Sequence, residues 1–203
     1  MKNKRYFLAI IVCVLIAVAS IGLVACGDKG NSGLKENQLT FAEGTTIEDI
    51  YAMFENGEIN SLTVRMIMET DDMTQENEIK IDGNLSVERM YANGVELETY
   101  ISYSVYEQDE HRVYTIVNPY ASSMEKDYFW QITEEDFITE TLEMVRGRIG
   151  DNEVTISATS VECRVNAGGD LPLKLILQDF NCTTESLPSE YSNYKELAQE
   201  KNW

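Results

Sequence analysis

Hydrophobic positions along the chain follow first a helical period and then a strand period. In the helical part, apolar side chains are spaced by three and four residues, at Ile47, Ile50, Tyr51 and Phe54. Thr45 or Thr46 is suited to cap the start of this segment, and Asn56-Gly57 to end it. The spacing predicts an amphipathic helix of about three turns that docks on a core.

From residue 62 onward, apolar positions alternate with polar ones, which is typical of strands. The first alternating run has Leu62, Val64, Met66 and Met68 on one side. The longest run places polar residues on one face and, on the other, Ile79, Ile81, Gly83, Leu85 and Val87. We expect one strand here, with a dry and a wet face, in which Gly83 marks either a bend or a place where another group approaches closely.

A tight hairpin is predicted at Asn93-Gly94, because both central residues of a type I′ turn have positive φ. The segment after it alternates again, with apolar or half-polar side chains at Val95, Leu97, Thr99, Ile101, Tyr103 and Val105. Shorter strands are predicted at 111–117, before the breaker Asn118-Pro119, and at 128–132.

A second amphipathic helix is predicted to begin at Thr133, with Asp136 three residues later, and to end at Gly150. A short helix is expected after Pro188. Antiparallel strands together with amphipathic helices that can cover them indicate the α+β class.

The last two alternating runs, 154–165 and 173–180, are predicted to form a hairpin around Gly168-Gly169. Within the first run the apolar residues change parity between Ala158 and Val161. An extra residue in one strand has this effect, so we expect a bulge near Thr159-Ser160.

The amino-terminal residues have the order of an export signal. Lys2, Lys4 and Arg5 precede an apolar run, and the run ends in Leu23-Val24-Ala25-Cys26. This ending resembles the motif of bacterial lipoprotein signals, and the resemblance implies removal of residues 1–25 and acylation of Cys26. The alternative is an uncleaved membrane-spanning helix. Both place the rest of the chain on the extracytoplasmic side of the cell membrane.

Three segments follow from this interpretation: a signal peptide at 1–25, a flexible tether at 26–44, and a single domain at 45–203. Near the end of this tether, Leu39 and Phe41 are large apolar residues, which are typical of a folded domain and not of a flexible tether. An anchor of two or three acyl chains holds the membrane firmly, so the domain itself needs no membrane-binding surface.

The negative charge of the chain limits the classes of molecule that it can be expected to bind. Its formal net charge is −19, and loss of the three signal-peptide cations makes it about −22. Such a chain is repelled by phosphate, so nucleic acid is not expected as a partner. The acidity either keeps an exported protein soluble or attracts a basic envelope protein.

The sequence contains few of the residue patterns that catalytic sites require. His111 is the only histidine and lies at a predicted strand end. A zinc site needs several His or Cys ligands at short spacing, and a phosphate loop needs glycines before a helix, so we expect neither metal nor cofactor. The chain is interpreted as a non-enzymatic protein.

Two cysteines remain in the domain, Cys163 and Cys182. An oxidising exterior permits a disulfide between them. A turn centred on Gly168-Gly169 places Cys163 opposite Leu175, which leaves Cys182 about 23 Å away along the strand. Bridged cysteines need Cα atoms within about 7 Å, so a bridge requires the chain to fold back after Phe180.

The dry face of the predicted sheet is the best candidate for ligand binding. Its candidate residues are Met66, Met68, Ile81, Leu85, Leu97, Ile101 and Tyr103. Methionine adapts to varied shapes, which suits an apolar cavity for a lipid. The alternative is a closed core in which the two helices cover the sheet.

The order of elements is a lipoprotein signal, a capped helix, alternating strands, a second helix and a hairpin with Leu171-Pro172-Leu173-Lys174-Leu175. It resembles the LolA/LppX-like lipoprotein carriers. The resemblance implies a curved antiparallel half-barrel with both helices on its concave face, and a hydrophobic ligand or lipid. The competing hypothesis is an acidic protein-interaction module, such as a sensor, inhibitor or immunity lipoprotein, with a closed core.

Overall fold

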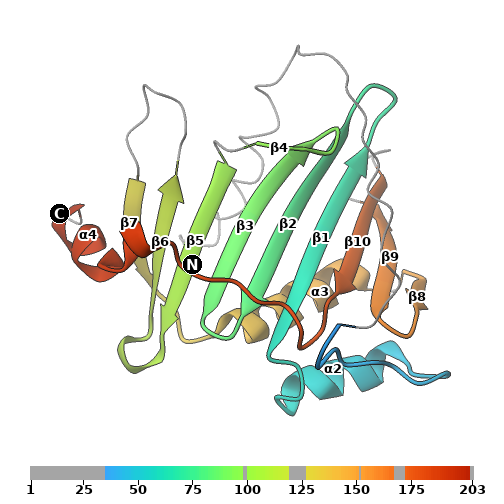
Figure 1. Ribbon diagram of the computed structural model, residues 1–203. Coiled ribbons are helices and arrows are strands. Elements are labelled where there is room, and N and C mark those ends of the chain that lie inside the picture. Colours follow the sequence, from blue (N-terminus) through green and yellow to red (C-terminus); the bar gives the residue numbers. More distant parts are fainter. Residues whose placement is uncertain (1–34, 98–99, 119–126, 151, 167–171, 202–203) are drawn as a thin grey trace.

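The computed structural model describes residues 35–97, 100–118, 127–150, 152–166 and 172–201 (Figure 1). The described helices are α2 (Ile47–Glu55), α3 (Phe137–Ile149) and α4 (Tyr194–Lys201), with 3-10 turns η3 (Gln108–Glu110) and η4 (Ser189–Tyr191). The described strands are β1 (Ser61–Glu69), β2 (Thr74–Asp82), β3 (Leu85–Ala92), β4 (Val95–Glu96), β5 (Ile101–Glu107), β6 (Arg112–Asn118), β7 (Asp127–Ile132), β8 (Val154–Ile156), β9 (Ser160–Asn166) and β10 (Pro172–Gln178).

All these strands belong to one sheet in the order β7-β6-β5-β3-β2-β1-β10-β9-β8, with β4 paired to β3. Every pairing is antiparallel. In the part of the chain that is described, β7 and β8 are the two outer strands, so the sheet is open. The predicted α+β class with a mostly antiparallel sheet is confirmed.

The two predicted helices are present, one with a shifted start. Thr46 caps α2 as predicted, and a reciprocal bond from its backbone to the Asp49 carboxylate completes a capping box. The second helix begins four residues later than predicted, at Phe137, because Asp136 and not Thr133 is its N-cap. The carboxylate of Asp136 accepts from the backbone N–H of Thr139 at 2.7 Å, which satisfies one of the free donors of the first turn.

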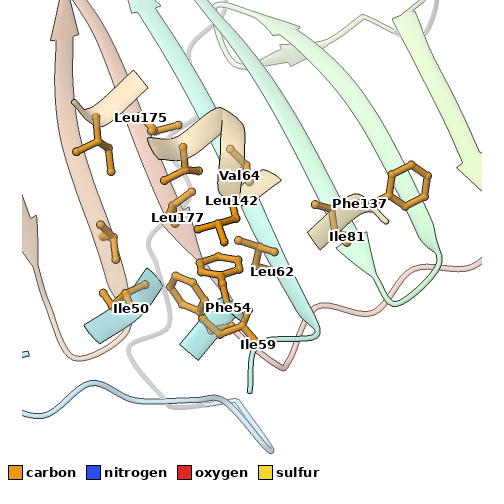
Figure 2. Packing of buried hydrophobic residues seen from close by; sticks show 14 of the residues in the cluster. Ile50, Phe54, Ile59, Leu62, Val64, Ile81, Phe137, Leu142, Leu175 and Leu177 are labelled. Carbon is orange, nitrogen blue, oxygen red and sulfur yellow. The ribbon is translucent and has the colours of Figure 1, made fainter. Parts of the chain in front are cut away.

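Helices α2 and α3 cover one face of the sheet, which we call the helix-side face, over β1, β2, β9 and β10. Figure 2 shows Ile50 and Phe54 of α2 packed with Leu142 of α3 against the strands. On the sheet, this core contains Leu62, Val64, Ile81, Leu175 and Leu177. Each such side chain contributes about 1.5–3 kcal/mol through burial, so this core accounts for most of the apolar stabilisation of the domain.

The chain reverses at Gly83-Asn84 and does not continue as one strand. Gly83 has a φ of +58°, and Asp82 pairs directly with Leu85 across the turn. Directly paired residues share a face, so Ile81 shares its face with Ser86 and not with Leu85. The prediction of a single dry face from Ile79 to Val87 was therefore wrong.

A second apolar core lies on the opposite face as a result. It contains Leu85, Val87, Ile101 and Val105. Its cover is the end of the chain, residues 184–201, which we call the C-terminal arm. In Figure 1 the arm crosses the front of the sheet from the base of β10 to β7. We call the face of the sheet that the arm covers the arm-side face. The short helix predicted after Pro188 is present there as η4 and α4.

Three other strand predictions have definite outcomes. The Asn93-Gly94 hairpin is confirmed, with φ of 50° and 77°. The segment after it forms two strands and not one: Val95–Glu96 pair with β3 as β4, and β5 begins at Ile101. In place of the predicted bulge near Thr159-Ser160, β8 turns back onto β9, with Ile156 opposite Val161.

The domain begins earlier than residue 45. The backbone N–H of Leu39 donates to the carbonyl of Phe180 at 2.9 Å, and Phe41 is buried against the Phe180 ring. The end of the predicted tether is thus part of the fold. The predicted signal peptide, the predicted acylation site Cys26 and the predicted Gly168-Gly169 turn lie outside the described residues. None of the helices in the described ranges is long and apolar enough to cross a membrane.

Candidate functional site: the methionine face

The predicted ligand-binding residues do not share one face. Met66, Met68 and Ile81 lie on the helix-side face. Leu85, Ile101 and Tyr103 lie on the arm-side face. Leu97 falls between β4 and β5, where its backbone N–H donates to the carbonyl of Met90 at 2.7 Å.

Three of these seven residues are buried and closed off from a ligand. Ile81 is 1% exposed inside the helix-side core. Leu85 and Ile101 are buried under the C-terminal arm, where Leu187 and Tyr194 pack on them. The alternative of a closed core therefore describes these positions better than an open cavity.

Met66 and Met68 remain partly exposed, and strand pairing adds further residues beside them. Asn77 of β2 lies between Met66 and Met90 of the neighbouring strands. We call this surface the methionine face and define it as Met66, Met68, Met90, Gln75, Asn77 and Glu88. In Figure 1, α3 lies behind the lower part of the sheet and α2 lies at the lower ends of its strands. By strand pairing, the residues of the methionine face lie toward the end where β1 turns into β2.

Asn77 carries the polar chemistry of the methionine face. Its Nδ2 donates to the Glu88 carboxylate at 2.7 Å. Its Oδ1 is buried and has no hydrogen-bond partner among the described residues. A buried acceptor without a donor costs about 1–3 kcal/mol, and a ligand that supplies an N–H group recovers this cost. The site can thus bind a hydrogen-bond donor when the flexible thioether side chains beside Asn77 move aside and uncover this oxygen.

Asn77, Met90 and Glu88 were missed by the sequence reasoning, although Asn77 carries a detectable signal. It has the same parity as Ile79 and Ile81, so an amide occupies a position of the apolar face of β2. Glu88 and Met90 could not be placed without knowing that the chain reverses at Gly83-Asn84, because the reversal decides which face they occupy.

The arm-side face of the same strands carries ion pairs. Arg65 contacts Glu76 with Nε at 2.5 Å and an Nη at 2.8 Å, in a two-pronged arrangement. Arg89 contacts Glu185 of the arm in the same manner, at 2.9 and 3.2 Å. Burial raises the pKa of the Glu185 carboxyl, but Arg89 and Lys80 outweigh it, so this pKa is lower than usual. Glu185 therefore holds the arm as an anion.

Among the residues that the structure describes, the side chains considered as catalytic candidates do not come together in one site. His111 is exposed at the end of η3. Both Cys163 and Cys182 are free thiols, and burial raises the pKa of each. Burial also raises the pKa of Glu140, which accepts a hydrogen bond from Thr133 at 3.2 Å. No cluster of three or more metal-binding side chains occurs among these residues.

One hollow of about 310 Å³ lies over β8, β9 and β10. It is wide open and lined mainly by polar side chains: Glu153, Thr155, Glu162, Cys163, Arg164 and Lys174. Lys174 and Glu162 pair across it at 2.7 Å. A lipid chain gains little from such a lining, because burying polar groups without partners is unfavourable.

Comparison with known proteins found no matching family model, no matching curated protein and no matching solved structure.

Proposed function

We propose that this chain is a lipid-anchored, extracytoplasmic binding protein without catalytic activity, and that it binds a polypeptide segment at the methionine face. The observation that carries the proposal is the buried Oδ1 of Asn77, which lacks a donor and lies between Met66 and Met90. A peptide offers both matching groups, a backbone N–H for the amide oxygen and apolar side chains for the thioethers.

Closure of both cores favours a polypeptide over a sequestered lipid. The helices fill the helix-side core, and the arm covers the other. A lipid carrier needs enclosed apolar volume, whereas a peptide needs a partly exposed strip of mixed polarity. The methionine face has this mixture.

The charge of the chain favours a basic segment. The mature chain carries about −22, and Glu88 adds a carboxylate to the methionine face itself. Opposite charge increases the rate of association and excludes acidic competitors. The partner class is therefore a basic, partly apolar segment of another envelope protein.

The proposal also includes a lipid anchor at Cys26 and a half-barrel shape for the sheet. Leu23-Val24-Ala25-Cys26 supports acylation at Cys26. We also infer that the sheet curves around α2 and α3 like the half-barrel of the LolA/LppX-like family, with the C-terminal arm on its outer side. Packing of both helices against one face supports this inference. A hydrophobic ligand is the second candidate function, because the three methionine side chains of the methionine face remain partly exposed.

Methyl NMR of methionine tests the proposal. The signal-free chain with Cys26→Ser is labelled at its methionine methyl carbons and titrated with a synthetic peptide of alternating lysine and leucine. We expect the Met66, Met68 and Met90 signals to shift. Met53 and Met144, which lie on α2 and α3 and not on the strands of the methionine face, serve as internal references that stay in place. Shifts with palmitate and none with the peptide would support the hydrophobic ligand instead.

A pair of amide substitutions localises the binding. Asn77→Leu removes the unpartnered oxygen, and we expect it to weaken peptide binding about tenfold, or roughly 1.4 kcal/mol. Gln131→Leu is the matched control, because Gln131 is an exposed strand amide of β7, which contributes no residue to the methionine face. It should change the affinity by less than about twofold. Equal losses in both variants would contradict the role of Asn77.

A further inference from the structure

The C-terminal arm is attached to the sheet by side chains. The backbone-to-backbone hydrogen bonds described within residues 184–201 join arm residues to each other, as from Tyr191 to Pro188 and from Leu197 to Asn193. Where the arm backbone reaches the sheet, the N–H of Glu185 donates to the carboxylate of Asp82 at 3.0 Å. The arm can therefore leave without breaking a strand pairing.

The middle of the arm supplies apolar contacts. Leu187 and Tyr194 pack on the arm-side core. The Tyr191 ring, 1% exposed, lies 5.9 Å from the Tyr103 ring, and the Tyr194 ring lies 5.7 Å from that of Tyr114. These contacts occur in one strip along β3, β5 and β6, so the face is shaped for one segment of this composition.

The two ends of the arm carry opposite charges that match the face. Near its start, Glu185 meets Arg89 at 2.9 Å and Lys80 at 3.4 Å. Near its end, Lys195 meets Glu107 and Glu110, each at 3.1 Å. The face therefore has a basic end and an acidic end, which fixes the direction in which an arm can bind.

The chain is fixed to the sheet immediately before the arm. Asn181 donates its backbone N–H to the carbonyl of Ser61 at 2.8 Å, and its side chain bonds the backbones of Glu58 and Asn60 at 2.6 and 2.9 Å. The Thr183 hydroxyl lies 3.2 Å from that of Thr63 in a buried hydrogen bond. Thr184, the next residue, is exposed and separates this fixed segment from the rest of the arm, so a change of its backbone angles would redirect the arm.

We propose that the arm-side face is an interaction surface for a second copy of this chain, and that two copies bind by exchanging C-terminal arms. The exchanged pair makes the same apolar and ionic contacts as the closed monomer. Such exchange is a low-cost route to a dimer, since no new interface has to be formed. The charge pattern of the face selects an arm with an acidic start and a basic end, which a second copy supplies.

Complementary charge variants test the exchange. One full-length signal-free chain carries Glu185→Arg and another carries Arg89→Glu. Within each variant, the side chains at positions 185 and 89 carry the same charge and repel each other. Between the two variants, the arm of one carries the charge opposite to that at position 89 of the other. We expect each alone to be a monomer by light scattering, and their equal mixture to form a dimer. A mixture that stays monomeric, with the β1 and β2 amides of both variants still protected from hydrogen exchange, would overturn the proposal.

Two controls separate exchange from misfolding. The chain with both Glu185→Arg and Arg89→Glu restores the pair within one molecule and should stay monomeric. Glu196→Arg makes the same change of charge at an exposed arm residue, and its mixture with Arg89→Glu should not dimerise.

A second measurement does not depend on the Arg89 variant. A fluorescent peptide of residues 184–203 is titrated into full-length chains and its anisotropy is followed. The Glu185→Arg chain, whose own arm is weakened, should bind the peptide about tenfold more tightly than the Glu196→Arg chain. Equal affinities would overturn the proposal.

Discussion

Ile81 and Leu85, separated only by a three-residue stretch that contains the Gly83-Asn84 turn, lie in two different cores on opposite faces of one sheet. Their positions have the same parity, and a two-residue hairpin pairs residues of opposite parity. The hydrophobic side of the sheet therefore switches at this turn. The switch requires a second cover, which the C-terminal arm provides.

Gly83 allows this turn, and its substitution should be costly. Its φ of +58° is the left-handed region, while an added Cβ would meet nothing within 4 Å. We expect Gly83→Ala to lower the free energy of unfolding by about 1–2 kcal/mol through backbone strain alone. Gly147 in α3 also has open space around it, but no positive φ, so Gly147→Ala should stabilise by roughly 0.5–1 kcal/mol. Urea denaturation measures both, and equal signs would contradict the assigned turn.

Truncation in each core should loosen a different cover. Ile81→Ala removes a side chain that is 1% exposed under the helices, and should cost about 2–4 kcal/mol. Leu85→Ala acts under the arm and should cost less, about 1–2 kcal/mol, because the arm can settle onto the smaller residue. Hydrogen exchange distinguishes the two variants.

In the Leu85→Ala chain, amides of the arm should exchange faster while those of α2 stay protected. The Ile81→Ala chain should show the reverse order. If both variants accelerated the arm and α2 equally, the two cores would form one cooperative unit, and the side-chain attachment of the arm would have no independent consequence.

Local signals predicted the elements well, because each has a local cause. The Thr46 capping box, the Asn93-Gly94 turn and the alternation of β1 depend on residues close in sequence. The pairing of Cys163 with Leu175 was also predicted, since hairpin register follows from the position of the turn. These are the features in which sequence distance and spatial distance agree.

The predictions of which side chains share a face of the sheet failed where the chain reverses direction. Alternation through Gly83 is compatible with a bend in one strand and with a hairpin, and only the hairpin moves Leu85 to the other face. The parity change from Ile156 to Val161 had the same cause, because residues of different parity pair across this turn. It was interpreted as a bulge, since a bulge also shifts parity. Pairing partners, which the pattern of one strand does not contain, decide between the two.

The arm could not be predicted as a cover, because its signal is sparse. Leu187, Tyr191 and Tyr194 are separated by polar residues, and α4 is short. Its place on the sheet depends on contacts across the chain, such as that between Glu185 and Arg89. Likewise, the donor-free Oδ1 of Asn77 becomes visible only when its neighbours on two other strands are known.

Alkaline pH should release the end of the arm. Burial and the hydrogen bond to Glu107 raise the pKa of Tyr194 from 10.0 to about 12. A raised pKa means that the fold favours the protonated phenol, so its stabilisation is complete below pH 10 and is lost as the pH rises toward about 12. For Lys195, burial opposes but Glu107 and Glu110 raise the pKa more strongly, so its loss of charge acts in the same direction.

Ultraviolet titration of the phenols measures this shift. The difference between the wild-type chain and Tyr194→Phe isolates one tyrosine, and its midpoint should lie near 12. The groups that face it are Glu107 of β5, Glu110 of η3, Tyr114 of β6 and Lys195 of α4. Glu107→Gln should lower the midpoint toward 10.0, because it removes the neighbouring charge. A wild-type midpoint at 10 would place Tyr194 in solvent and the arm off the sheet.

Acylation at Cys26 gives the anchor a direct test. In cells fed labelled palmitate, the wild-type chain should take up label and lose residues 1–25, whereas Cys26→Ser should do neither. Cys13→Ser is the matched control, since this cysteine lies within the proposed signal and its substitution should leave labelling intact. Each buried methylene contributes about 0.8 kcal/mol, so the two or more acyl chains of the proposed anchor would suffice to hold a domain at the membrane without help from its surface. An unlabelled wild-type chain of full length in the membrane would show that the apolar run is itself the anchor, as an uncleaved helix.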